Sequence, residues 1–178
     1  MFQRTAQGAL VCVAALIAAS SSYAQEKTSM TSSRAEMKNG KGEMVGSVAL
    51  TETGSGVRIS GNLKNLPAGV HGLHLHQMGK CDAPDFKSAG EHFNPLNKQH
   101  GELNPSGPHA GDLGNVTVKS DGSVSLNVVA KNVTLKPGPA SLLHPDGTSL
   151  MIHAKEDDRR TDPSGNSGDR LACGVVTR

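Results

Sequence analysis

Leucine and histidine alternate between positions 69 and 76, and this alternation limits how the chain can fold more than any other feature. The segment reads Gly-Val-His-Gly-Leu-His-Leu-His, with Leu73 and Leu75 at odd positions and His74 and His76 at even ones. Successive side chains of a β-strand point to opposite faces. The segment is therefore predicted to be a strand whose leucines face a core. Its two histidines then lie side by side on the other face, as half of a rigid metal site.

Short β-strands separated by turn residues are predicted for most of the remaining chain. Apolar patterning indicates strands over 44–51, 57–63, 116–119, 124–129 and 149–153. No long segment has the helical period, and 21 glycines with 9 prolines fit many turns. The fold class is therefore predicted to be all-β, a sandwich or a barrel. Two long stretches, 77–115 and 154–172, border histidines, and we expect them to form the functional site.

The first 24 residues have the parts of a secretory signal peptide. Arg4 supplies a positive charge, residues 9–19 an apolar stretch, and Ser22-Tyr23-Ala24 a small-residue cleavage site. The apolar stretch is too short to span a membrane, and no later segment approaches a span. We expect a signal peptide over 1–24, a polar disordered segment over 25–33, and one domain over 34–178.

Cysteine usage and charge narrow the class of protein further. Cys12 leaves with the signal peptide, and Cys81 and Cys173 remain. An oxidising compartment favours a disulfide between them, and two free thiols in a metal site are the alternative. The net charge is +2 with no basic tract, which argues against a nucleic-acid partner. An aromatic content of 2% argues against stacking on bases or sugars.

The chain has eight histidines, all of them after the signal peptide. His153 ends the predicted strand 149–153 on the face opposite its core residues, as His74 and His76 do in theirs. A rigid set of imidazoles on strands can impose the near-planar geometry that Cu(II) favours. His71 shares the parity of the core leucines and is expected to be buried without binding metal. His144 lies in a turn and is expected to face solvent.

A second set of candidate ligands lies in the long stretch 77–115. It consists of His92, His100 and His109, with Asp112 three residues after the last histidine. Three imidazoles and one carboxylate are a suitable tetrahedral set for zinc. The sequence therefore predicts two metal sites of different composition.

Six motifs of the chain resemble, in type, order and spacing, those of the copper/zinc superoxide dismutase family. They are Gly72-Leu73-His74-Leu75-His76, Ala89-Gly90-Glu91-His92-Phe93-Asn94-Pro95, Lys98-Gln99-His100-Gly101, His109-Ala110-Gly111-Asp112-Leu113-Gly114-Asn115, Met151-Ile152-His153 and Gly168-Asp169-Arg170-Leu171-Ala172-Cys173-Gly174-Val175. The resemblance runs from about residue 34 to 176. It implies a Greek-key β-barrel of eight strands with two long functional loops.

The resemblance also implies the site residues, with one copper and one zinc ion per chain. Copper would be bound by His74, His76, His92 and His153. Zinc would be bound by His92, His100, His109 and Asp112, so that His92 bridges the two metals. Arg170 matches the arginine that attracts the anion beside copper, which makes His92 and Arg170 the implied catalytic residues. Asp157, with Asp158 as the alternative, matches the carboxylate that hydrogen-bonds His74 and His100, and Cys81–Cys173 matches the family's disulfide.

The implied activity is the disproportionation of superoxide to O₂ and H₂O₂ by copper cycling between Cu(II) and Cu(I) beside a structural zinc. With the signal peptide, this implies a periplasmic enzyme in antioxidant defence of the cell envelope. The resemblance is compatible with either a monomer or a homodimer. A non-enzymatic copper-binding protein on the same fold is the alternative, but it would be expected to lose copper ligands or the arginine.

The chain departs from familiar members in one stretch. Residues 162–166 (Asp-Pro-Ser-Gly-Asn) stand where a lysine-containing loop steers superoxide. Lys155, Arg159 and Arg160 are the candidates to replace that lysine.

Overall fold

A computed structural model describes residues 31–178 of the chain, together with Met1. The expected signal peptide lies outside the described residues. The elements are β1 (Ser32–Asn39), β2 (Met44–Thr53), β3 (Gly56–Leu63), β4 (Gly69–His76), η1 (Lys87–Ala89), β5 (Asp112–Val118), β6 (Val124–Ala130), β7 (Ser149–His153) and β8 (Arg170–Thr177). Among the described residues, no helix is long and apolar enough to cross a membrane.

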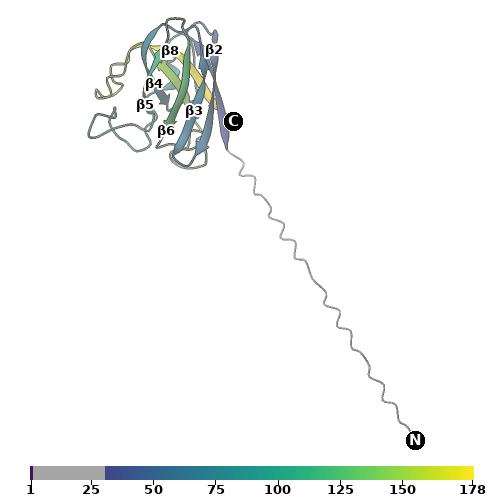
Figure 1. Ribbon diagram of the computed structural model, residues 1–178. Helices are drawn as coiled ribbons and strands as arrows, with labels where there is room; N and C mark the ends of the chain where they lie inside the picture. The colour runs from purple at the N-terminus through teal and green to yellow at the C-terminus, as the bar shows by residue number, and fades with distance from the viewer. Residues whose placement is uncertain (2–30) are drawn as a thin grey trace.

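The eight strands form one antiparallel sheet in the order β5-β4-β7-β8-β1-β2-β3-β6. The sheet curls until its edge strands β5 and β6 lie next to each other, which gives a nearly closed barrel (Figure 1). β3 pairs with β6 and β4 pairs with β7, so two connections cross between strands as in a Greek key. The predicted all-β, eight-stranded fold is confirmed.

Aliphatic side chains fill the barrel, because alternate residues of each strand face inward. Leu73 and Leu75 of β4 meet Leu150 and Ile152 of β7 in register, and all four are fully buried. Burial of each such side chain contributes about 1.5–3 kcal/mol. The predicted strand parity therefore holds: the leucines are inside, and His74 and His76 lie on the outer face.

β1 lies in a region where the sequence pattern predicted no strand. Ser32 and Ser33, expected in a disordered segment, pair with Thr51 and Leu50 of β2. The burial pattern of β1 alternates, with Ser33, Ala35 and Met37 inside. Small and polar residues hide this alternation in the sequence, and backbone pairing with β2 and β8 decides it. Residues 25–30 of the expected disordered segment lie outside the described residues.

The two long connections cover the outer face of β4, β7 and β8, and Figure 1 shows both on the same side of the barrel, in teal and in yellow. Beneath the first connection, Phe86, Ala89, Met151 and Cys173 form a second, smaller apolar cluster. The disulfide Cys81–Cys173 ties that connection to β8 and confirms the predicted pairing. The outer face of β4 is therefore buried as completely as its inner face.

Both connections are shorter than predicted. β5 begins at Asp112 and β8 at Arg170, so these two residues belong to strands. Asp112 pairs in register with His74, and Arg170 pairs with His153. The sheet itself thus sets these side chains beside the histidines of neighbouring strands.

Candidate metal centre

Four buried histidines converge on the outer face of the barrel. His74 and His76 come from β4, His153 from the end of β7, and His92 from the first long connection, where it forms an isolated bridge with His76. One ring nitrogen from each lies within 4.8 Å of the others. We call these four residues the all-histidine group.

The second ring nitrogen of three of these histidines is held by an oxygen atom. His76 Nδ1–H donates to the Gly90 carbonyl (2.9 Å) and His153 Nδ1–H to the Gly168 carbonyl (3.1 Å). His74 Nε2–H donates to Asp157 Oδ2 (2.8 Å). A neutral imidazole has one N–H, so each of these bonds assigns the tautomer and leaves the other nitrogen with a free lone pair. Metal-binding histidines are held in this way.

Burial keeps the all-histidine group neutral. It lowers the pKa of His76 to about 2, of His153 to about 3 and of His92 to about 4. Burial also lowers the pKa of His74, although Asp157 acts in the opposite direction. The neutral imidazole is the form that binds a metal ion, so the group needs no loss of protons before it can do so.

A second group of ligand atoms surrounds Asp112. Its Oδ1 lies 2.9 Å from His92 Nδ1, 3.0 Å from His100 Nδ1 and 3.2 Å from His109 Nδ1. Its Oδ2 accepts the backbone N–H groups of Gly101 and His109, each at 2.9 Å. Burial disfavours the carboxylate, but hydrogen bonds from the histidines hold the pKa of Asp112 well below its usual range. We call His92, His100, His109 and Asp112 the Asp112 group.

His100 presents one ring nitrogen to Asp112. Its Nδ1 is buried and makes no hydrogen bond, although Asp112 Oδ1 is only 3.0 Å away. The N–H direction therefore does not match that oxygen. Burial lowers the pKa of His100, but Asp112 and Asp157 raise it to about 9. A positive charge is thus favoured between the two carboxylates, whether a proton or a metal ion supplies it.

His74, a member of the all-histidine group, also lies close to the Asp112 group. One ring nitrogen of His74 lies within 4.8 Å of ligand atoms of His92, His100 and Asp112, a cluster that omits His109. His109 is nevertheless the better fourth member of the Asp112 group, because its Nδ1 faces the same carboxylate oxygen as His92 and His100. The Nε2 of His74 is already held by Asp157.

His92 is the member that the two groups share. Its Nδ1 faces Asp112, while its Nε2 is buried with no hydrogen-bond partner. Its ring lies 4.0 Å from that of His74 and 5.0 Å from that of His76, measured between centroids. His92 therefore presents one nitrogen to each group.

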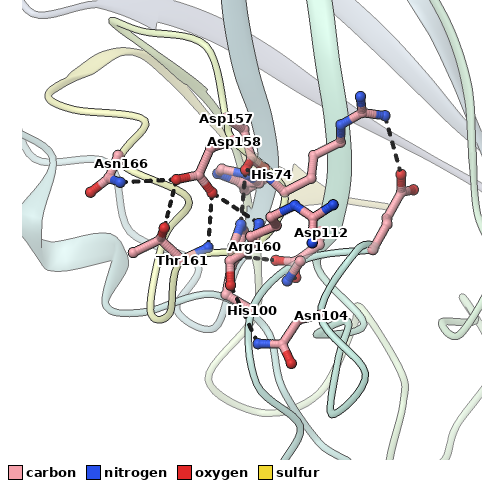
Figure 2. Close-up of polar contacts among 12 residues, drawn as sticks. His74, His100, Asn104, Asp112, Asp157, Asp158, Arg160, Thr161 and Asn166 are labelled. Atoms are coloured by element: carbon pink, nitrogen blue, oxygen red, sulfur yellow. Dashed lines mark hydrogen bonds and ion pairs between the residues drawn. The ribbon is translucent and has the colours of Figure 1, made fainter.

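Asp157 connects the two groups, because its carboxylate bonds one histidine of each. Figure 2 shows Asp157 together with His74 and His100. Its Oδ2 accepts the N–H of His74 (2.8 Å) and its Oδ1 that of His100 (2.9 Å). Burial opposes ionisation of Asp157, but these hydrogen bonds hold its pKa below the usual range. The Asn115 side chain bonds both the N–H and the carbonyl of Asp157 at 2.8 Å. Sequence reasoning missed Asn115, because only the fold brings it next to residue 157.

Arg170 is tied to the same backbone as the all-histidine group. Its Nη1 donates to the Phe86 carbonyl and its Nη2 to the Gly90 carbonyl, both at 2.7 Å. The Gly90 oxygen also accepts from His76. Arg170 lines a surface pocket together with Pro84, Asp85, Lys87, Glu91, Gly168 and Asp169. Backbone carbonyls carry no sequence motif, which is why these anchors were not predicted.

The cations considered for steering lie in different places. Arg159 lies 3.9 Å from Glu102, and Arg160 donates to the Leu103 carbonyl at 3.5 Å, so both contact the first long connection. The aliphatic part of Lys155 packs beside Gly168, at the wall of the Arg170 pocket. Lys87, which sequence reasoning did not consider, lines the pocket itself.

The two histidines outside both groups differ from each other. His71 is buried, with Nδ1 at the His153 carbonyl and Nε2 at the Pro67 carbonyl, both 2.9 Å away, as expected for a structural residue. The expectation that His144 faces solvent was wrong. It is half-buried, and its ring stacks on Phe93, because the turn that carries it folds back onto the barrel.

The two groups fit two metal ions. Within these two groups, three buried ring nitrogens have no hydrogen-bond partner: His74 Nδ1, His92 Nε2 and His100 Nδ1. An unpartnered buried polar atom costs about 1–3 kcal/mol, which coordination to a cation would offset. The all-histidine group suits copper, and the set of three imidazoles and one carboxylate suits zinc.

Comparison with known proteins finds a matching family and similar chains. The family model described as copper/zinc superoxide dismutase matches residues 44–176. The copper/zinc superoxide dismutase 1 of Aquifex aeolicus (strain VF5) is 50% identical over 144 residues, which are 80% of this chain and 85% of that protein.

Solved structures of similar fold are also found. A double mutant of a superoxide dismutase-like protein from Bacillus subtilis has a TM-score of 0.79 at 42% identity, covering 82% of this chain and 97% of the other. The copper/zinc superoxide dismutase of Brucella abortus has a TM-score of 0.64 at 32% identity, covering 82% and 99%.

Proposed function

The chain belongs to the copper/zinc superoxide dismutase family, whose cofactors are copper and zinc, and from this membership we propose how its residues serve superoxide dismutation. The all-histidine group (His74, His76, His92 and His153) holds copper. The Asp112 group (His92, His100, His109 and Asp112) holds zinc. All these ligands come from one chain, so neither metal site requires a second copy to complete it.

When bound, copper supplies the redox chemistry, in which one superoxide is oxidised to O₂ and a second is reduced to H₂O₂ with two protons, whereas zinc has no redox chemistry. His92 is the group in the site that can hold and deliver a proton, at Nε2. Its Nδ1 is directed at Asp112, and its buried Nε2 has no other hydrogen-bond partner. This placement of one nitrogen toward each group is the observation that carries the proposal of a bridging His92.

Outer contacts keep the ligands oriented without a contribution from the metal. Gly90 and Gly168 fix the rings of His76 and His153 through backbone carbonyls, which do not titrate. Asp157 fixes His74 and His100 together, so a displacement of one group is transmitted to the other. Such contacts set ring orientation and tune ligand basicity.

Arg170 binds the superoxide anion in this proposal. A guanidinium has five N–H donors and stays charged at all physiological pH values. Two of these donors bond the Phe86 and Gly90 carbonyls, which holds the group in place, and the others are available to a small anion. Because Gly90 also holds His76, the anion site and the copper site share one anchor.

We place the enzyme in the periplasm, in antioxidant defence of the cell envelope. The Cys81–Cys173 disulfide supports this placement, because disulfides persist in oxidising compartments.

Copper EPR before and after removal of zinc tests the bridge. The loaded protein should contain one copper and one zinc per chain, and its copper spectrum should change when zinc alone is removed. A His144→Ala variant is the matched control, since His144 stacks on Phe93 outside both groups, and its spectrum should respond to zinc as the parent's does. A copper spectrum insensitive to zinc would contradict the bridge. Absence of dismutase activity in the fully loaded protein would contradict the function.

A further inference from the structure

The two long connections meet beside the Asp112 group. The Leu103 N–H donates to the Arg159 carbonyl (3.0 Å), and the Asn104 side chain contacts the Arg160 carbonyl (3.3 Å), a contact shown in Figure 2. These bonds join the connection after β4 to the connection after β7, but they do not reach a metal ligand. Asp162 makes a further contact between the connections that reaches two ligands, whereas the hydrogen bond between Asp157 and His100 reaches one.

The Asp162 carboxylate faces two proposed zinc ligands at once. Its Oδ1 accepts the backbone N–H of His100 at 2.6 Å, which fixes the carboxylate in position. The same oxygen lies 3.8 Å from His109 Nε2. The His109 side chain is 8% exposed and that of Asp162 is 48% exposed, so Asp162 sits at the border between the buried group and solvent.

His109 otherwise lacks the outer contact that the neighbouring ligands have. His100 and His74 donate their Nε2–H to Asp157, and His76 and His153 donate their Nδ1–H to backbone carbonyls. When His109 Nδ1 binds the metal, the single N–H of the ring lies at Nε2, which faces away from the Asp112 group and toward Asp162. At 3.8 Å this carboxylate oxygen is beyond direct hydrogen-bond distance, and it acts on the ring N–H through its charge.

We propose that Asp162 is a positioning residue of the zinc site, which acts on His109 through its ring N–H and on His100 through its backbone. The proposal rests on the proposed function only in naming zinc as the metal of the Asp112 group. A carboxylate beside the N–H of a metal-binding imidazole favours one orientation of the ring and raises the basicity of the ring. Asp162 supplies this contact from the other connection, so zinc affinity depends on the two connections being joined.

Two substitutions separate the actions of Asp162. Asp162→Ala removes both the acceptor for His100 and the charge beside His109. Asp162→Asn keeps an oxygen that can accept the His100 N–H but removes the charge. Asp158→Asn is the matched control in the same connection, because the Asp158 carboxylate bonds only Arg160, Thr161 and Asn166 of its own connection.

The experiment measures zinc affinity of the copper-loaded protein by competition with a chromophoric chelator. Removing such an outer contact typically lowers metal affinity by about 10- to 100-fold, which is the loss expected for Asp162→Ala. Asp162→Asn should show a smaller loss and Asp158→Asn the affinity of the parent. The His109 ring N–H resonance of the zinc-loaded protein is the second readout, and it should shift in both Asp162 variants but not in Asp158→Asn.

Parent-like zinc affinity of Asp162→Ala would overturn the proposal, and so would an equal loss in Asp158→Asn. If Asp162→Ala does not fold, the affinity and the ring N–H resonance of Asp162→Asn decide the question. A parent protein that binds no zinc would refute the zinc assignment of the Asp112 group and this proposal with it. Parent-like behaviour of the variants in a zinc-binding enzyme refutes only the role of Asp162.

Discussion

Replacing both cysteines of the Cys81–Cys173 disulfide with alanine should lower the free energy of unfolding by about 4–5 kcal/mol. The bond joins residues that are 92 apart in the sequence. Without it, the unfolded chain regains the entropy of an open loop of that length, and the chain-entropy model assigns about 4–5 kcal/mol to such a loop. Cys173 is also buried in the cluster with Phe86 and Met151, so some packing is lost as well.

A loss of this size is large against the total stability of a domain, which is typically about 5–15 kcal/mol. Urea unfolding of the metal-free protein measures it, because metal that binds only the native state would otherwise add to the apparent stability. With a slope of about 2 kcal/mol per molar urea, the unfolding midpoint should fall by about 2 M. Reductant should lower the unfolding midpoint of the parent protein by the same amount. It should leave the midpoint of the double variant unchanged. A loss below about 2 kcal/mol, or a parent insensitive to full reduction, would refute the loop-entropy reasoning.

Two further substitutions test the site. Asp157→Ala should weaken both metals by about 10- to 100-fold in chelator competition, because Asp157 orients one ligand of each group. Asp158→Ala is its exposed control, and a loss confined to one metal would contradict the shared role. Arg170→Ala should lower kcat/KM for superoxide by about tenfold or more in stopped-flow decay, at unchanged metal content. Arg170→Lys keeps the charge but loses the planar guanidinium that bonds the Phe86 and Gly90 carbonyls. Its kcat/KM should lie between that of the parent and that of Arg170→Ala. An alanine variant as fast as the parent would remove Arg170 from anion binding.

Local periodicity predicted the strands that build the centre of the barrel. The alternation of Leu73 and Leu75 with His74 and His76 assigns the two faces of β4 without knowledge of its neighbours, because side-chain direction in a strand is a local property. The same rule placed His153 on the outer face of β7. The motifs then predicted family membership, which the comparisons confirmed.

Periodicity did not predict the strands and strand ends whose apolar alternation is weak. β1 carries Ser33, Ala35 and Met37 inward, a set too small and too polar to stand out in the sequence. The loop boundaries were misplaced at Asp112 and Arg170, because strand pairing with β4 and β7 extends β5 and β8 into stretches that read as loops. His144 was assigned to solvent because a turn motif says nothing about what the turn folds against.

The sequence by itself predicted the residue types of the proposed site, the faces of its strands and the family of the chain. These follow from residue identity and from a period of two, both of which are local. Only the tertiary structure decided which atoms hold those residues: the Gly90 and Gly168 carbonyls, Asn115 behind Asp157, and Asp162 beside His109. These contacts join segments far apart in the chain, often through backbone oxygens that every residue possesses. Their identity is therefore fixed by how the connections pack on the barrel rather than by any motif.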